Sequence, residues 1–148
     1  RRVAPCRVLE VDEAGPAICF QLLNEPSLDD RMGTWSAQNF TDTPWATRDK
    51  VALNWRQYLA DEPAQPYAAP ARATDLSGLP PAYIASAEFC PNRDEDIAYA
   101  VALLQAGVSV ELHQWSGTFH GSQAVLSADV SQRQIHEINS ALRRALAG

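Results

Sequence analysis

The chain has 148 residues, of which 46% are hydrophobic and 20% charged, a balance typical of one folded domain rather than a disordered segment. Its net charge of −6 argues against nucleic acid as a partner, because phosphate binding needs clustered lysine and arginine side chains. No apolar run approaches the roughly 20 residues of a membrane span, so we expect no membrane partner. The three cysteines share no ligand spacing, which predicts no metal site and suits a reducing, cytoplasmic location.

The first half of the chain predicts one strand and one helix. Residues 1–15 mix charges with a proline and predict no regular element. Residues 17–23 form a short apolar run bounded by prolines, which is typical of a buried strand. Residues 49–59 carry apolar side chains at helical spacing, with Thr47 as the expected N-cap. The five prolines of residues 63–81 indicate a long extended connection.

The second half alternates strands and helices. Residues 82–87 predict a second buried strand, and residues 94–106 an amphipathic helix. Apolar and polar residues alternate over 108–113, which predicts a third strand directly afterwards. Ser131 and Gln134 form a capping-box pattern that would open a final helix. Strands separated by helices and tight turns predict an α/β fold, with a mostly parallel sheet of about three strands flanked by helices.

Three stretches of sequence occur in a characteristic order. They are PSLDDRM at 26–32 followed by FTDTPW at 40–45, LPPAY at 79–83 running into AEFCPNRDE at 87–95, and LQAGVSVELH at 104–113 followed by GTFHG at 117–121. In order and spacing they resemble the hormone-sensitive-lipase family of α/β-hydrolase esterases, especially its bacterial heroin-esterase-like members. The resemblance spans about residues 16–148 and implies family strands six to eight. We therefore expect one domain over 1–148, in which 1–15 match the family poorly.

The resemblance implies hydrolysis of carboxylic esters by a serine, a histidine and an aspartate acting together. His120 falls on the family's catalytic histidine. The residues agree, because His120 follows the third strand between two glycines, at a carboxyl end where open α/β sheets bind ligands. His113 is expected to be a strand-face residue, and His136 a solvated helix residue.

The acid is where this sequence departs from the family. The family places an aspartate before the proline of its D-P-x-x-D-E motif, and here that position is Cys90. A thiol supplies no permanent negative charge to an imidazolium, so it would orient His120 only weakly. Asp94 is a substitute acid if the loop rearranges, or else a capping carboxylate at the start of a helix. A Cys90–His120 thiol pair is the remaining alternative.

Two further family motifs are absent from the 148 residues. None of the seven glycines belongs to a G-x-S-x-G nucleophile motif, and no HGGG motif occurs. The chain therefore resembles a truncated carboxylic-ester hydrolase that is inactive alone, acting on a small ester only if a second polypeptide complements it. The alternative is a non-catalytic module that oligomerises or binds a partner. An unrelated binding protein would make the three matched stretches a coincidence. No cofactor is expected.

The strand at 17–23 is expected to lie at an edge of the sheet. In the family it pairs on one side with the strand near 82–87 and on the other with a fifth strand, which this sequence lacks. Unpaired edge groups are a template for pairing, and 17–23 carry no charge that would discourage it. We therefore expect a homo-oligomer joined through residues 17–23, or association with the missing N-terminal half.

Overall fold

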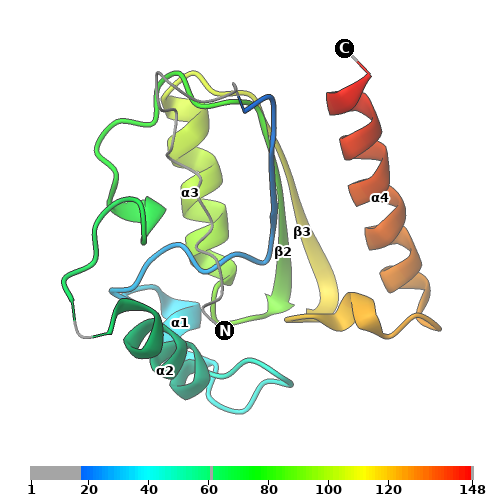
Figure 1. Cartoon of the computed structure of the whole chain (residues 1–148). Coiled ribbons are helices and arrows are strands. Elements are labelled where there is room, and N and C mark those ends of the chain that lie inside the picture. Colours follow the sequence, from blue (N-terminus) through cyan, green and yellow to red (C-terminus); the bar gives the residue numbers. More distant parts are fainter. Residues whose placement is uncertain (1–17, 61, 148) are drawn as a thin grey trace.

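The computed structural model describes residues 18–60 and 62–147, which form a sheet with helices around it (Figure 1). Its strands, helices and two short 3₁₀ turns follow the chain in the order β1 (Gln21–Asn24), α1 (Trp35–Asn39), α2 (Arg48–Leu59), η1 (Pro70–Arg72), β2 (Ala82–Phe89), α3 (Arg93–Gln105), β3 (Val110–Phe119), η2 (Ser122–Ala124) and α4 (Asp129–Leu146). Within these residues, no helix combines the length and apolar character that crossing a membrane requires.

β2 is the centre of the sheet. The strand order is β1-β2-β3 and both pairings are parallel, with Gln21 opposite Ala82 and Ala82 opposite Val110. Every residue from 82 to 87 is buried, because both faces of a parallel sheet are covered. This confirms the α/β fold with three parallel strands. Since the strands run in one direction, their carboxyl ends meet at a single edge of the sheet.

α3 and α4 cover opposite faces of this sheet (Figure 1). On the α3 face, Ile84 of β2 belongs to one apolar cluster with Tyr99 and Leu103. On the α4 face, Tyr83 belongs to a second cluster with Ala141. Ile84, Tyr83 and Leu103 are each fully buried, and burying a side chain of this size contributes roughly 1.5–3 kcal/mol. The alternation of β2 side chains thus builds both halves of the core.

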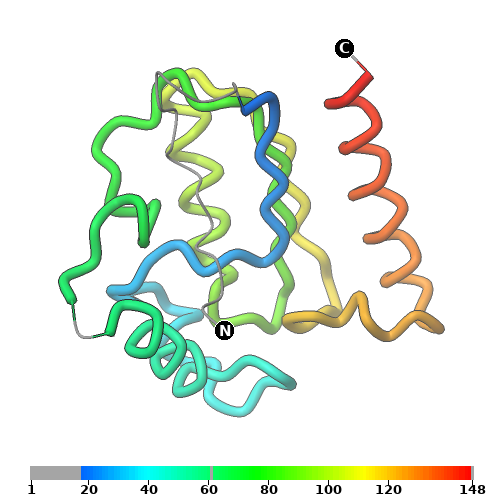
Figure 2. The backbone as a smooth tube through the Cα atoms, in the orientation of Figure 1, coloured from blue at the N-terminus to red at the C-terminus, as the bar shows by residue number. Residues whose placement is uncertain are grey.

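α1 and α2 lie at the end of the molecule where the strands finish, as the tube trace shows (Figure 2). Thr47 caps α2 as expected, because its side chain accepts a hydrogen bond from the Lys50 N–H. Thr34 caps α1 in the same way through the Ala37 N–H. The sequence pattern did not predict α1, which is only five residues long. These two helices therefore lie beside the carboxyl ends of the strands.

Several expected boundaries are corrected by the structure. β1 is Gln21–Asn24, at the C-terminal end of the expected 17–23, while residues 1–17 lie outside the described part of the chain. β3 continues to Phe119 instead of ending near residue 113, because its pairing with β2 persists that far.

The expected capping box of the last helix was wrong. α4 begins at Asp129, so Ser131 already lies inside the helix and cannot be its N-cap. The Ser131 hydroxyl instead donates to the carbonyl of Ser122, and Gln134 is buried. Ser131 therefore fixes α4 to the turn that follows β3.

Candidate active site

His120 is the first residue after β3, at the carboxyl-end edge of the sheet. Two glycines flank His120: Gly117, near the end of β3, and Gly121, directly after the histidine, have φ of +71° and +77°, the left-handed region that glycine adopts without strain. The backbone therefore changes direction on both sides of His120, which presents the imidazole at the carboxyl-end edge of the sheet. The side chain is 36% exposed, and burial lowers the pKa of His120. A neutral imidazole at this position can accept a proton.

Cys90 lies against this imidazole. It follows β2 directly, and its Sγ is 3.3 Å from Nδ1 of His120. The expected contact between the residues that follow the two adjacent strands is therefore confirmed. Cys90 is fully buried, and burial raises the pKa of its thiol far above the ordinary range. The sulfur remains a neutral S–H at physiological pH, so it provides no charge opposite an imidazolium.

Glu25 is a second neighbour of His120, and the sequence interpretation missed it. It follows β1 directly, and its Oε2 lies 3.6 Å from Nδ1 of His120. The same oxygen accepts a hydrogen bond of 2.6 Å from the Gly121 N–H. The side chain is only 2% exposed, and burial raises the pKa of Glu25 against the opposing effect of the Gly121 bond. Its sequence signal was an acidic residue between a buried apolar run and Pro26.

Asp94 faces a different part of the molecule. Its carboxylate accepts hydrogen bonds from the Ser36 N–H at 2.8 Å and from the Arg93 guanidinium at 2.8 Å. The Ser36 bond joins the first turn of α3 to the start of α1. Burial would raise the pKa of Asp94, but the two bonds lower it overall. The structure therefore places Asp94 in a helix-joining position and not beside His120. Asp94 lies in the first turn of α3, but its carboxylate accepts the Ser36 N–H of α1 and makes no contact with His120 among the described residues.

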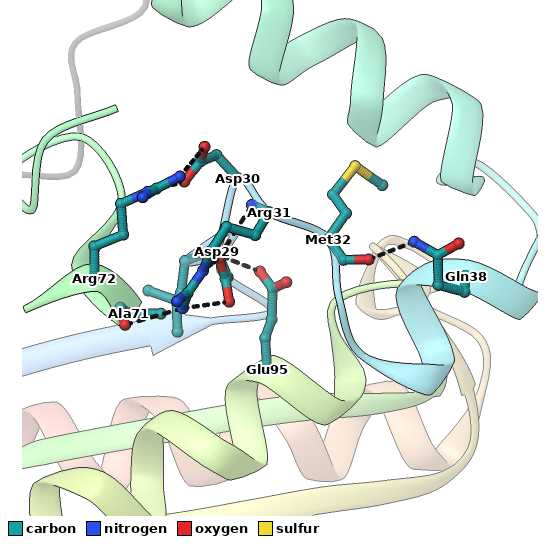
Figure 3. Close-up of polar contacts among 9 residues, drawn as sticks. Asp29, Asp30, Arg31, Met32, Gln38, Ala71, Arg72 and Glu95 are labelled. Atoms are coloured by element: carbon teal, nitrogen blue, oxygen red, sulfur yellow. Dashed lines mark hydrogen bonds and ion pairs between the residues drawn. The ribbon is translucent and has the colours of Figure 1, made fainter. Parts of the chain in front are cut away.

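The loop that follows Glu25 is fixed from α3. Oε1 of Glu95 accepts the Leu28 N–H at 2.7 Å and the Asp29 N–H at 3.3 Å, and the close-up shows Glu95 reaching from the helix to this loop (Figure 3). Asp30 pairs with Arg72 through two hydrogen bonds of 2.6 and 2.9 Å. The loop therefore has little freedom next to the β1 end that carries the glutamate.

Aromatic rings pack against the residues before and after His120. The Trp45 ring packs edge-on against Phe119, with 6.1 Å between centroids, and a Cβ on Gly121 would lie 2.6 Å from the Trp45 ring. Trp45 is 58% exposed, so its ring presents apolar surface beside Phe119 and Gly121, the chain neighbours of His120. A second edge-on pair, Phe40 and Phe89, has 6.3 Å between its ring centroids, and Phe89 lies opposite Phe119 in the sheet. Such rings favour an apolar substituent over a charged one.

One group of potential metal ligands lies away from this edge, between β3 and α4. Glu111, His113 and Glu137 bring one ligand atom each within 4.8 Å of one another. Glu111 is already bound by the Arg144 guanidinium and by Nε2 of His113. The His113 ring stacks between Tyr83 and Trp115, as a strand-face residue would. These partners give the group a structural explanation.

A sequence family described as alpha/beta hydrolase fold matches residues 3–124, which include everything from β1 to η2. The chain belongs to the alpha/beta-hydrolase fold family. Esterase LipI of Mycobacterium tuberculosis is 42% identical over 115 residues, which cover 74% of this chain and 35% of LipI. The carboxylic ester hydrolase LipN of the same organism is 37% identical over 139 residues, covering 91% of this chain and 37% of LipN.

Solved structures of esterases superimpose on this alpha/beta-hydrolase chain over most of its length. A bacterial heroin esterase matches with a TM-score of 0.84 at 51% identity, covering 87% of this chain and 43% of the other. Esterase LipW from Mycobacterium marinum matches with a TM-score of 0.86 at 40% identity, covering 90% of this chain and 42% of LipW. The chain thus spans well under half the length of these relatives, and it is a member of the hormone-sensitive-lipase family of esterases.

Proposed function

We propose that the chain supplies the histidine side of a carboxylic-ester hydrolase site, with His120 as general base. The serine nucleophile and the oxyanion-binding donors would come from a polypeptide segment outside these 148 residues, since no G-x-S-x-G or HGGG motif occurs among them. The observation that carries the proposal is the orientation of His120. Its Nδ1 faces Cys90 and Glu25, so Nε2 lies on the opposite side of the ring and is available to a nucleophile.

The chemistry follows from this arrangement. Nε2 would take the proton of a serine hydroxyl as its oxygen attacks the ester carbonyl carbon, and would then give that proton to the leaving alcohol oxygen. Positioned general-base catalysis contributes about 10²–10⁴-fold to such a reaction. The rings of Trp45 and Phe119 beside His120 favour a small ester with an apolar substituent. The 148 residues alone would hydrolyse no ester.

A chimera tests this proposal. The 148-residue chain is fused behind the nucleophile-bearing remainder of the bacterial heroin esterase, the part of that protein which this chain does not cover. We expect the chimera to hydrolyse p-nitrophenyl acetate, and His120→Ala to lower kcat by about 10³-fold. His136→Ala, an exposed helix position, is the matched control and should leave kcat unchanged. A folded chimera without hydrolysis, or with hydrolysis that survives His120→Ala, would contradict the proposal.

The β1 edge favours a second function, association with another strand. Among residues 18–60 and 62–147, β1 pairs with β2 alone, and Leu22 on this strand is exposed. An unpaired strand edge accepts another strand through its N–H and C=O groups. The partner would be the nucleophile-bearing segment or a second copy of this chain, and a symmetric dimer is the common form for copies.

Sedimentation equilibrium separates these partners. If copies pair through the β1 edge, the 148-residue chain is a dimer at micromolar concentration and Leu22→Lys makes it a monomer. Leu104→Lys, an exposed leucine on α3, should leave the dimer intact. A wild-type chain that stays monomeric would leave the nucleophile-bearing segment as the partner of this edge.

A further inference from the structure

We propose that Glu25 is the positioning residue that orients His120, in the role that the family's aspartate has at the position of Cys90. The inference rests on the proposed function of His120. It moves the acid from the end of β2 to the end of β1, two strands away from the histidine at the end of β3. Nothing in the order of sequence motifs places an acid there.

The reach of the glutamate makes this relocation possible. Because β1 borders β2 and not β3, a carboxylate at its end must extend past the end of the central strand to approach His120. Cys90 occupies that strand end with a small side chain. Oε2 of Glu25 arrives 3.6 Å from Nδ1, a distance that closes to a hydrogen bond with a small rotation. An aspartate at residue 25 would fall short by about 1.5 Å, the length of one C–C bond.

Hydrogen bonds from neighbouring elements hold the backbone of Glu25 in a strained conformation. Its φ is +51°, the left-handed region, which costs a non-glycine residue about 1–2 kcal/mol. The strained residue is held from both sides, by its own N–H to the Ala85 carbonyl at 2.8 Å and by Asn92 Nδ2 to its carbonyl at 3.5 Å. Strained backbone that neighbouring elements over-determine is concentrated at functional sites. The surrounding contacts therefore aim the side chain.

The carboxylate itself is held but not saturated. Oε2 accepts the Gly121 N–H at 2.6 Å, which ties the acid to the loop that carries the histidine. Oε1 is buried and has no hydrogen-bond partner among the described residues. Leaving a buried acceptor without a partner costs about 1–3 kcal/mol, so the carboxylate keeps capacity for a further donor, and Nδ1–H is the nearest side-chain donor that the structure gives for it. A purely structural glutamate would be expected to use both oxygens.

Cys90 offers the competing arrangement. If its S–H donates to Nδ1, the neutral ring carries its proton on Nε2 and cannot accept one from a serine. If Nδ1–H points to Glu25, Nε2 is free and the imidazolium that forms in catalysis faces a carboxylate. Charge decides between them, because an ion-assisted hydrogen bond is about twice as strong as a neutral one. A thiol is in addition a weak donor.

The other acids near this edge have different partners. Asp94 binds Ser36 and Arg93, and Glu95 binds the Leu28 and Asp29 N–H groups. Asp96 is fully buried in the first turn of α3, and the structure shows no contact between it and His120. Glu25 is therefore the acid that the described residues bring to the imidazole.

The test uses ¹⁵N NMR of the 148-residue chain to read the tautomer and the pKa of His120, with His113 and His136 as internal references. We expect the Nδ1–H tautomer in the wild type, and a pKa of His120 that falls by about 1–2 units in Glu25→Gln. Glu88→Gln is the matched control. Glu88 accepts the Gly117 N–H at 2.6 Å, the same kind of bond made three residues before His120 near the end of β3, but the structure gives no contact between Glu88 and His120. We expect it to change the pKa of His120 by less than about 0.3 units.

A rescue variant separates orientation from folding. Cys90→Asp in the Glu25→Gln background returns a carboxylate to the family's position and should restore the wild-type tautomer and pKa of His120. Should Glu25→Gln fail to fold, Glu25→Asp makes the same comparison, because it keeps the charge but withdraws it from Nδ1. An Nε2–H tautomer in the wild type, or a pKa of His120 that is equal in the wild type and the Glu25 variant, would overturn the inference.

These outcomes are independent of the chimera. If the pKa of His120 is unchanged in Glu25→Gln and the chimera is active, the positioning role of Glu25 is rejected but His120 remains the general base. If the chimera is inactive but the tautomer of His120 depends on Glu25, the proposed ester hydrolysis is rejected and the proposal that Glu25 orients His120 is kept. In an active chimera we further expect Glu25→Gln to lower kcat by about 10²–10⁴-fold, with KM little changed, and Cys90→Asp to recover most of that loss.

Discussion

The two faces of the sheet and its carboxyl-end edge are built from opposite kinds of residue. The faces bury aliphatic and aromatic side chains against α3 and α4, as Ile84 and Tyr83 do. The edge buries polar and ionisable groups, several of them in one small region where the strands end. They are Glu25, Cys90, Asn92, Glu95, Asp96, Thr118 and Ser122. Apolar burial stabilises the fold, whereas burial of polar groups costs free energy unless each finds a partner.

The backbone shows the same division. Glu25, Met32 and Trp45, all in the segments that follow β1, have positive φ although none is glycine. Each such residue costs about 1–2 kcal/mol relative to relaxed backbone. β2 and α3, by contrast, contain no residue with positive φ. Packing on the two faces of the sheet therefore stabilises the fold, whereas backbone strain and polar burial at its carboxyl-end edge destabilise it. Substitutions in the two regions should change the free energy of unfolding in different ways.

The largest loss of stability is expected on the α3 face. Leu103→Ala removes a fully buried side chain from the cluster around Ile84 and should lower the free energy of unfolding by about 4 kcal/mol. The pKa of His120 in the remaining folded protein should not change, because Leu103 lies away from the edge. Urea unfolding and NMR titration measure the two quantities. Leu104→Ala, one residue further and 55% exposed, is the control and should cost less than about 0.5 kcal/mol.

At the carboxyl-end edge of the sheet, a substitution should raise or lower the free energy of unfolding depending on the new residue and on pH. Burial raises the pKa of Glu95 to about 7 from its ordinary value of 4.5. A raised folded-state pKa means that the stability present below pH 4.5 is lost as pH rises toward about 7. Glu95→Gln keeps an oxygen for the Leu28 N–H and removes this cost, so it should be more stable than the wild type above pH 7 by roughly 2–3 kcal/mol.

Comparing Glu95→Ala with Glu95→Gln isolates the hydrogen bonds that the Glu95 side chain accepts. Glu95→Ala removes the acceptor of the Leu28 and Asp29 N–H groups and should cost about 1–3 kcal/mol below pH 4.5, where Glu95→Gln is neutral. Chemical denaturation over this pH range compares the three proteins. Because other groups at the edge titrate in the same range, the difference between variant and wild-type curves is the measured quantity. Parallel curves for Glu95→Gln and the wild type would contradict a raised pKa.

The faces of the sheet were predictable from the sequence, because their signal is local. Residues 82–87 are apolar except for Ser86, and residues 94–106 carry an apolar stripe at helical spacing. β2 and α3 lie there with small shifts. α1 was not predictable from periodicity, because its five residues depend on long-range bonds from Ser36 to Pro91 and Asp94. The capping box at Ser131 failed for a related reason, since the side chain bonds to the carbonyl of Ser122.

The site was predictable only where a motif described it. His120 and Cys90 follow adjacent strands, and their contact was expected from the order of the family's stretches. Glu25 was missed because its role depends on a contact across 95 residues of sequence, from the end of β1 to His120. Its signal was an acidic residue just after a buried apolar run, a position that a periodicity argument interprets only as the end of a strand. Only the parallel sheet makes that strand end a neighbour of the histidine loop.

The smallest expected effect isolates one contact of the His120 loop. Gly117 and Gly121 have similar positive φ, so alanine at either position should cost about 1 kcal/mol in backbone strain. Only at Gly121 would the added Cβ meet another group, the Trp45 ring at 2.6 Å, whereas nothing lies within 4 Å at Gly117. Because Trp45 is exposed its ring can swing away, so the extra cost of Gly121→Ala should stay below about 1 kcal/mol. Urea unfolding of both variants, repeated in a Trp45→Ala background, forms a double-mutant cycle in which that extra cost disappears. Equal costs at the two glycines in the presence of Trp45 would show that the ring does not pack against the loop.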